Sequence, residues 1–296
     1  MSMRKLLQNI KFLAKHDLRK YVQATIDAAI NNADLYENLK YEISDSIGKH
    51  KIKSVCNIMD SVDILLHSEK SLIRFGDGEI FLMYGQGIPF QTASVELSKR
   101  LKHAMSTRSE TLMVAIPQAL YSSKEGMKPY ARNFWRNNGN KFRAMIESCV
   151  DFDNNTYYAS ELTLGFSNQN IPKEIYFSKF REIWNNRDIV IICGKTVFKD
   201  TVHNIFDNAK SAEYIYTPSK NAFTDYENIF TQSMKCDKNK LFIAICGPTA
   251  KVLCWDLHAN GRRALDLGHI AKSYDWYMRG REITSLSDGQ NFFAPD

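Results

Sequence analysis

The chain has 296 residues, of which 44% are hydrophobic and 24% are charged, and its formal net charge is +6. This composition supports a sizeable buried core, and no window reaches the ~18 uncharged apolar residues of a membrane span. The modest positive charge suits an anionic ligand or an anionic membrane surface and does not require nucleic acid, so we expect no nucleic-acid partner.

Six cysteines are scattered through the sequence without a C-x-x-C pair or a histidine cluster. This distribution is typical of small apolar side chains in a reducing compartment, not of a disulfide framework or a zinc site. We also find no signal peptide at the start of the sequence. Together these features predict a cytoplasmic protein.

Residues 1–58 are predicted to form a helical N-terminal extension, followed by one domain over 59–296. Apolar Leu6, Ile10 and Leu13 recur at helical spacing among many lysines and arginines. Such a basic amphipathic helix can make peripheral contact with the inner face of the cell membrane. We favour the alternative, a helix packed on the main domain or on a second subunit of a homo-oligomer.

From about Ser61 onward, short apolar runs alternate with helical segments. Uninterrupted apolar runs are typical of strands buried on both faces of a parallel sheet. The alternation predicts an α/β, Rossmann-like fold, with a mostly parallel sheet and helices on both faces. The predicted strands are Leu72–Phe75, Leu112–Ile116, Thr156–Ser160, Ile189–Cys193, Tyr214–Thr217, Leu241–Cys246 and Ala264–Leu267.

The first of these strands runs directly into two carboxylates placed between glycines, Gly76-Asp77-Gly78-Glu79. Ligands of such a sheet bind outside the carboxyl ends of its strands. Two carboxylates two residues apart can point the same way and suit Mg²⁺ or Mn²⁺ carrying a diphosphate. The glycines would let the backbone approach a ligand closely, and Arg74 could neutralise a phosphate.

Asp77 could instead cap the helix that follows it, and the sequence favours neither this role nor metal binding. The segment after it is predicted to be helical, and aspartate is a favoured N-cap residue. A capping box that starts at Asp77 would need its glutamate at Ile80, so we expect Glu79 to have no capping role.

A second region of interest begins with the turn Gly247-Pro248-Thr249, which leads into a predicted helix over Ala250–Ala259. Thr249 would cap that helix, whose N-terminus suits a phosphate. Taken alone, the tripeptide is more simply explained as ordinary turn and cap chemistry. Asp266 and His269 follow the next predicted strand, and His269 could act as base, phosphate donor or metal ligand, although a lone histidine is more often structural.

Two other segments point less clearly to chemistry. The sequence "CGKT", Cys193–Thr196, follows a strand but lacks the first glycine of a Walker A motif, so no NTPase site is predicted. Basic and aromatic residues alternate over Lys128–Arg143, which could contact an acidic or sugar-like acceptor. We favour a helix surface with buried aromatic side chains for that segment.

Several blocks of the chain resemble the GT-D glycosyltransferase domain of bacteria, in order over roughly residues 60–278. They are "SLIRFGDGEIFLMYGQGIPFQ", "IWNNRDIVIICG", "NIFDNAKSAEYIYTPSKNAFTDYENI" and "ICGPTAKVLCWDLHANGRRALDLGHIAKSYDWYM". The resemblance implies a nucleotide-sugar donor, typically a UDP-sugar, with Mn²⁺ or Mg²⁺ held by a D-x-E motif at Asp77 and Glu79. The sugar would be transferred to a growing polysaccharide or glycoprotein of the bacterial surface, with a lipid-linked or protein-linked acceptor.

The resemblance also implies roles for further residues. Arg74 becomes a donor contact, and the family's C-terminal block is matched by Gly268-His269 and Tyr274-Asp275-Trp276. His269 and Asp275 are therefore expected to act as donor contacts or as the base for the acceptor hydroxyl.

Other positions complete the expected site or differ from the family. We also expect donor binding by Gly76, Gly78, Gly247, Thr249 and Asp266. The chain has Cys193-Gly194-Lys195 where the family often has an acidic residue, and it has Ala271 and Ser273 where acids are common. The identity of the substrates therefore cannot be copied from a relative.

The sequence thus predicts a metal-dependent glycosyltransferase, and two other classes of function stay open. A metal-dependent phosphohydrolase could use the same carboxylates but needs more metal ligands than the sequence places. A non-catalytic scaffold of a glycan-assembly complex would retain the fold alone. Intact Asp77, Glu79 and His269 count against the scaffold.

Overall fold

The computed structural model describes residues 55–283 except 123 and 125, together with positions 26, 288, 289 and 292. The chain divides into two compact units, Met1–Ile52 and Lys53–Asp296. The predicted basic helix of the N-terminal extension lies outside the described residues, apart from Ile26, which is helical.

The boundary predicted at residue 58 needs a correction. Strand β1 (Val55–Cys56) pairs in parallel with β4 (Tyr157–Ala159), so the sheet of the main unit begins before residue 59. Asn57 then caps the next helix by accepting a hydrogen bond from the backbone N–H of Asp60 at 2.9 Å. A strand of two residues is too short to leave a recognisable apolar pattern, which is why the sequence did not reveal it.

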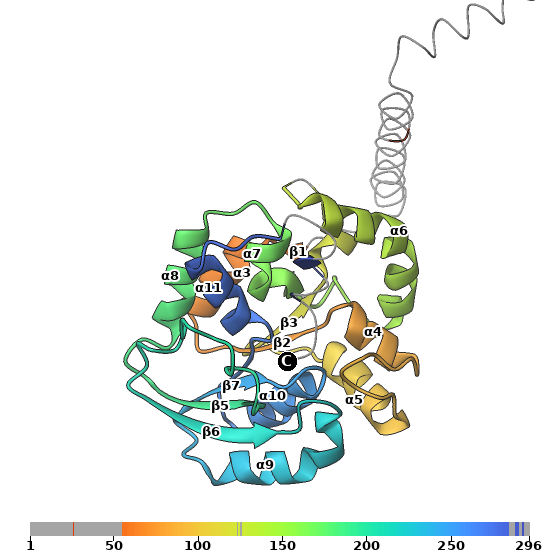
Figure 1. Ribbon diagram of the computed structural model, residues 1–296. Helices are drawn as coiled ribbons and strands as arrows, with labels where there is room; N and C mark the ends of the chain where they lie inside the picture. Colours follow the sequence, from red (N-terminus) through yellow and green to blue (C-terminus); the bar gives the residue numbers. More distant parts are fainter. Residues whose placement is uncertain are drawn as a thin grey trace, which may run out of the picture. The chain divides into compact units, whose positions relative to one another are not determined.

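The described residues form one parallel sheet of eight strands in the order β1-β4-β3-β2-β8-β7-β5-β6 (Figure 1). The remaining strands are β2 (Ser71–Arg74), β3 (Leu112–Ile116), β5 (Asp188–Gly194), β6 (Ser211–Thr217), β7 (Leu241–Ile245) and β8 (Ala264–Asp266). The α/β, Rossmann-like fold predicted from the sequence is confirmed.

Helices cover both faces of this sheet (Figure 1). One face packs against α3 (Ile58–Leu66), α8 (Lys173–Ile183) and α11 (Ile270–Met278), with the short α7 (Gly165–Asn168) beside them. The other face packs against α4 (Asp77–Met83), α5 (Val95–Met105), α6 (Pro129–Ile146), α9 (Tyr226–Lys235) and α10 (Thr249–Ala259).

Alternation along the strands explains the two cores. In β3, Leu112, Val114 and Ile116 face one core, while Met113 and Ala115 face the other. Because successive side chains of a strand point to opposite faces, a strand that is covered on both sides must be apolar throughout.

All seven predicted strands are present, and the largest error is in β6. The prediction began at Tyr214, whereas the strand begins at Ser211. β6 is the edge strand of the described sheet, and its first four residues are exposed. An edge strand that faces water need not be apolar, so its beginning leaves no apolar run in the sequence.

Candidate active site

A cavity of about 790 Å³ lies at the carboxyl ends of the strands, as the sequence analysis expected for a ligand site. Its walls come from the segments that follow β2, β4, β5, β6, β7 and β8, and its volume is within the roughly 300–1,000 Å³ that is usual for small-molecule sites. The lining residues that the sequence singled out for the site are Arg74, Gly76, Asp77, Gly78, Glu79, Gly247 and His269.

The turn after β2 corrects the expectation about helix capping. The N-cap of α4 is Gly76, so Asp77 is the first helical residue and Glu79 occupies the third position. One carboxylate oxygen of Glu79, Oε2, accepts a hydrogen bond from the backbone N–H of Gly76 at 2.8 Å. Glu79 therefore does have the capping role that the sequence analysis denied it, and Asp77 does not cap the helix.

A buried ion pair connects β2 to β8 beneath the cavity. The guanidinium of Arg74 donates from Nε to the carbonyl of Asp266 at 2.8 Å and from Nη1 to the carbonyl of Ser160 at 3.0 Å. Its Nη2 pairs with Oδ1 of Asp266 at 3.2 Å. These bonds fix the side chain and use three of its five N–H donors, so two donors remain for a ligand in the cavity.

Lys251, on the first turn of α10, completes this network. Its ammonium lies 3.0 Å from Oε1 of Glu79, 3.3 Å from Oδ2 of Asp266 and 3.2 Å from the carbonyl of Gly247. Burial alone would lower the pKa of Lys251, but the carboxylates of Asp266 and Glu79 outweigh it and the pKa is raised. Lys251 is therefore a permanent buried cation at the floor of the cavity.

Gly268 makes room for the arginine. Its φ of +43° lies in the left-handed region, and a Cβ at this position would come within 2.2 Å of Nη2 of Arg74. Glycine is therefore required both by the backbone conformation and by the guanidinium that packs against it.

Two titratable groups that face the cavity are held away from their charged forms. Burial, with a further contribution from the Glu79 carboxylate, raises the pKa of Asp77. Burial, together with the charges of Arg74, Lys272 and Lys251, lowers the pKa of His269 to about 3. A cation near Asp77 would favour its ionised form, and an anion near His269 would favour its protonated form.

Three residues predicted for the site do not line the cavity. Asp266 is fully buried and serves as counter-ion to Arg74 and Lys251, so it acts on the site from beneath. Thr249 is also buried, is the first residue of α10 and not its cap, and its hydroxyl has no partner among the described residues. Neither side chain lines the cavity.

Asp275 is the third predicted residue that does not line the cavity. Its Oδ1 accepts hydrogen bonds from the backbone N–H groups of Val202 and His203 at 2.9 and 3.0 Å, and its Oδ2 pairs with Arg279 at 3.2 Å. Burial alone would raise the pKa of Asp275, but these donors lower it. The side chain anchors the loop after β5 and does not line the cavity. It is therefore not placed to act as the base for the acceptor hydroxyl.

Lys251 and Glu161 are among the charged residues that line the cavity and that sequence reasoning missed. Each is a single charged residue within an apolar segment, "PTAKVLCW" and "YYASELTL", and each lies just beyond the end of a strand. A charge in such a segment costs free energy unless it is paired or functional, and this signal could have identified both.

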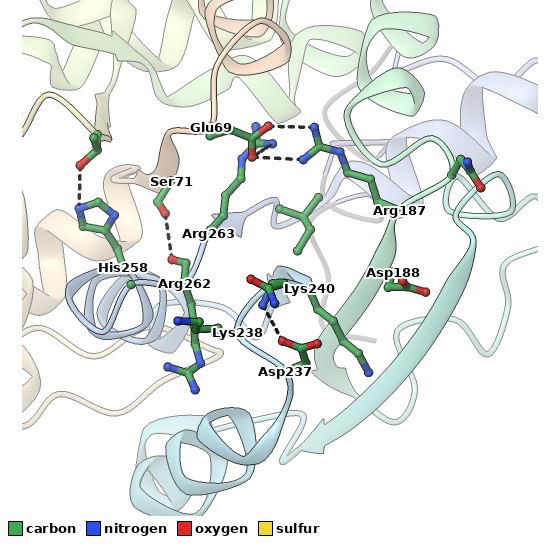
Figure 2. Close-up of a pocket in the computed structure, with 15 residues that line it drawn as sticks. Glu69, Ser71, Arg187, Asp188, Asp237, Lys238, Lys240, His258, Arg262 and Arg263 are labelled. Atoms are coloured by element: carbon green, nitrogen blue, oxygen red, sulfur yellow. Dashed lines mark hydrogen bonds and ion pairs between the residues drawn. The ribbon is translucent and has the colours of Figure 1, made fainter.

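A second cavity, of about 700 Å³, lies at the amino ends of β2, β5, β7 and β8 (Figure 2). Three of its charged residues, Glu69, Arg187 and Arg263, are paired with one another. Glu69 accepts two hydrogen bonds from Arg187, at 2.9 and 3.2 Å, and one from Arg263 at 3.0 Å. The hydrogen bond from Arg187 is the main cause of the lowered pKa of Glu69.

Comparison with known proteins identifies the class. Residues 72–290 match the family described as Glycosyltransferase GT-D fold, so the chain belongs to this family and the predicted resemblance is confirmed. Among solved structures, a new glycosyltransferase from Streptococcus sanguinis is 33% identical, with a TM-score of 0.74 over 82% of this chain and 93% of the other. A domain of unknown function 1792, described as having a distinct glycosyltransferase fold, is 34% identical, with a TM-score of 0.72 over 78% and 83%.

Two curated relatives are also similar. A probable glycosyl transferase of Streptococcus gordonii is 35% identical over 229 residues, and the glycosyltransferase GlyD of Streptococcus pneumoniae serotype 4 is 31% identical over 231 residues. Each match covers 77% of this chain but 33% and 28% of the relative, so the chain spans about a third of the length of these proteins. Glycosyltransferase, the enzyme class predicted from the sequence, is the class that both names give.

Proposed function

We propose that the cavity at the carboxyl ends of the strands is the active site of a glycosyltransferase that takes its sugar from a nucleoside diphosphate sugar, with a UDP-sugar as the first donor to test. The observation that carries the proposal is the pair of fixed cations, Arg74 and Lys251, below a cavity that also holds the Asp77 carboxylate. This charge arrangement suits a diphosphate that arrives with a divalent cation.

The transfer breaks the bond between the anomeric carbon and the diphosphate oxygen, and negative charge grows on the departing diphosphate. Arg74 keeps two N–H donors beyond its bonds to Asp266 and Ser160, and these donors can bind that charge. Because the guanidinium is already held rigidly, little reorganisation is needed when the charge develops. The beginning of α10, next to Gly247 in the cavity wall, adds the positive end of the helix dipole.

Mn²⁺ or Mg²⁺ is a second part of the proposal. Asp77 would be the main protein ligand, because one oxygen of Glu79 already accepts from Gly76 and the other pairs with Lys251. Among the described residues no three His, Cys, Asp or Glu side chains form a ligand group, so water and the diphosphate would provide the remaining ligands, as is common for Mg²⁺. A bound metal would supply charge neutralisation for the diphosphate.

The raised pKa of Asp77 fits this role. A carboxyl group that burial and a neighbouring carboxylate push towards its protonated form gains stabilisation when a cation replaces the proton. Metal binding should therefore weaken as the pH falls, and it should do so at a higher pH than for an ordinary aspartate.

The acceptor, the cellular location and the partners belong to the same proposal. The two curated relatives named as glycosyltransferases come from streptococci, and a bacterial surface glycan as the acceptor is a proposal from the family resemblance. In the described part of the chain, none of the helices is both long and apolar enough to cross a membrane. A cytoplasmic location, peripheral membrane contact through residues 1–58 and a homo-oligomer remain proposals from the sequence.

The decisive experiment measures release of UDP from a panel of UDP-sugars in the presence of Mn²⁺, without an acceptor, so that water takes the sugar slowly. We expect one donor to be turned over and Asp77→Asn to lower that turnover by roughly 10²–10³-fold. Asp237→Asn, an exposed residue of the other cavity, is the matched control and should leave turnover within about twofold.

Other outcomes would favour the other functions. Release of inorganic phosphate from UDP or from simple phosphate esters would favour the phosphohydrolase. Failure to bind UDP and Mn²⁺ at all would favour the scaffold. Equal turnover by wild type and Asp77→Asn would contradict the role of this carboxylate.

A further inference from the structure

The end of β4 brings a third carboxyl group into the cavity, in addition to the pair in the D-x-E motif. Glu161 lies in the 3₁₀ turn Ser160–Thr163, directly after the strand, and is 4% exposed. Its Oε2 accepts a hydrogen bond from the backbone N–H of Gln118 at 3.0 Å and one from the Ser160 hydroxyl at 3.4 Å. Its other oxygen, Oε1, is buried and has no hydrogen-bond partner among the described residues.

A buried carboxyl oxygen without a partner costs free energy, and the fold does not remove this cost. Glu161 lines the cavity, so a ligand there is the natural source of the missing partner. Burial is the main reason why the pKa of Glu161 is raised. A hydroxyl group can donate a hydrogen bond to Oε1 without bringing a charge into the cavity.

The cavity wall on this side is aromatic. Phe81 from α4 and Tyr130, Phe134 and Trp135 from α6 line the same cavity as Glu161. The Tyr130 hydroxyl donates to the carbonyl of Ser167 at 2.8 Å, and the Phe134 ring lies 5.1 Å from that of Trp135, so neighbours hold both rings. Rigid aromatic faces next to a polar anchor suit a hydroxyl-bearing ring that also has an apolar face.

The position of Glu161 relative to the cations narrows the class of ligand further. Ser160, the residue before it, accepts through its carbonyl a hydrogen bond from Arg74 at 3.0 Å. Glu161 therefore borders the place proposed for the diphosphate. An ionised phosphate has no proton to donate to Oε1, whereas the hydroxyl groups of the sugar attached to that phosphate, or of the sugar that attacks it, can donate one.

We propose that Glu161 and the aromatic side chains of Phe81, Tyr130 and Phe134 form a subsite for a neutral sugar ring, one hydroxyl of which donates a hydrogen bond to Oε1 of Glu161. The inference rests on the proposed glycosyltransferase function and adds the residues that select the sugar. The ring is either the transferred sugar of the donor or the terminal sugar of the acceptor, and the two have the same chemistry at this wall.

The test compares wild type with Glu161→Gln and Phe134→Leu in the full chain. Glutamine keeps an oxygen that can accept from Gln118, and leucine keeps an apolar side chain without the ring, so both variants should fold with an unchanged melting temperature. Glu147→Gln, an exposed residue of the turn Glu147–Cys149 that does not line the cavity, is the matched control.

Three measurements separate the possible sources of the sugar. Donor hydrolysis gives KM for the UDP-sugar, transfer to a panel of p-nitrophenyl β-glycosides gives KM for an acceptor, and titration with UDP alone gives the nucleotide affinity. We expect both variants to raise one of the two KM values by about tenfold or more, while UDP affinity stays within about twofold. A raised donor KM assigns the subsite to the transferred sugar, and a raised acceptor KM assigns it to the acceptor.

Saturation-transfer NMR with methyl glycosides measures contact with the sugar directly and needs no turnover. If wild type turns over no UDP-sugar and binds no UDP, the proposed function fails, yet the loss of the NMR signal in Glu161→Gln would still support the sugar subsite. Unchanged KM values and unchanged saturation transfer in Glu161→Gln would overturn the subsite. A loss of UDP affinity as large as the rise in KM would also overturn it.

Discussion

The two ends of the sheet carry cavities of similar volume but opposite electrostatic character. At the amino ends, Glu69 is paired with Arg187 and Arg263, and the pKa of its carboxyl group is lowered, chiefly by the hydrogen bond from Arg187 (Figure 2). At the carboxyl ends, the pKa values of Asp77 and Glu161 are raised, mainly by burial. The Glu69 carboxylate thus has cationic partners at the amino ends, whereas Asp77 and Glu161 form no ion pair among the described residues, although they lie beside the paired network of Arg74 and Lys251.

This difference shows which cavity is built for a ligand. Groups held away from their charged form lose stability in the free protein, and a ligand of the right charge can restore it. Groups that are already paired have little to gain from a ligand. The two cavities have similar volumes, about 790 and about 700 Å³, so volume does not indicate which of them binds a ligand. The charged groups that line them do.

The largest effect on stability should come from the buried cation of the carboxyl end. Lys251→Met would leave the carboxylates of Glu79 and Asp266 buried without their ammonium partner, at a cost of about 3–5 kcal/mol in the free energy of unfolding. Arg187→Met, at the amino end, removes an exposed pair and should cost about 0.2–1 kcal/mol. Urea unfolding measures both, and equal losses would contradict the comparison.

A pair of glycines offers the next test. Gly268 and Gly261 line the two cavities, both have positive φ, and alanine at either position should cost about 1–2 kcal/mol. Gly268→Ala should cost about 1–3 kcal/mol more, because its Cβ would meet the Arg74 guanidinium, while a Cβ at Gly261 would meet nothing within 4 Å. UDP titration should show weaker binding for Gly268→Ala only, and equal binding by both variants would argue against Arg74 as a donor contact.

The histidines of the two cavities predict a difference in acid stability. The pKa of His269 is lowered from 6.5 to about 3, so between these values the unfolded chain binds a proton that the folded chain does not. Stability from this residue is fully present above pH 6.5 and is lost as the pH falls, by at most about 1.4 kcal/mol per pH unit. His269→Gln should flatten the loss measured by urea unfolding at several pH values.

His258, in the cavity at the amino ends, provides the comparison for that measurement. Burial alone lowers its pKa, without the neighbouring cations that act on His269. His258→Gln should therefore flatten the acid loss over a narrower range of pH. An acid profile of His269→Gln that matches wild type would mean that the imidazole is protonated in the folded protein.

The smallest effect is expected for Glu69→Gln at the amino ends. The exposed carboxylate would lose its charge-assisted bonds to Arg187 and Arg263, which should cost about 0.2–1 kcal/mol in urea unfolding. Donor hydrolysis should stay within about twofold of wild type. A tenfold loss of turnover would show that this cavity takes part in function and would break the comparison.

The sequence by itself determined the class of fold and the edge of the sheet where ligands bind. Uninterrupted apolar runs, such as Leu112–Ile116, identify buried parallel strands, because a strand covered on both faces must be apolar throughout. The glycines and carboxylates directly after Arg74 then fall at the carboxyl end of a strand, where ligands bind in such sheets. These signals are local, so one sequence is enough to read them.

Tertiary structure alone decided which charged groups meet. Arg74 and Asp266 are separated by 192 positions in the chain, yet they form one buried pair, and Lys251 joins them from a helix. Nothing local distinguishes Asp275, which anchors a loop, from a carboxylate that faces the cavity. Side-chain partners depend on strand order and on the packing of helices over the sheet, which are properties of the whole chain and not of any segment.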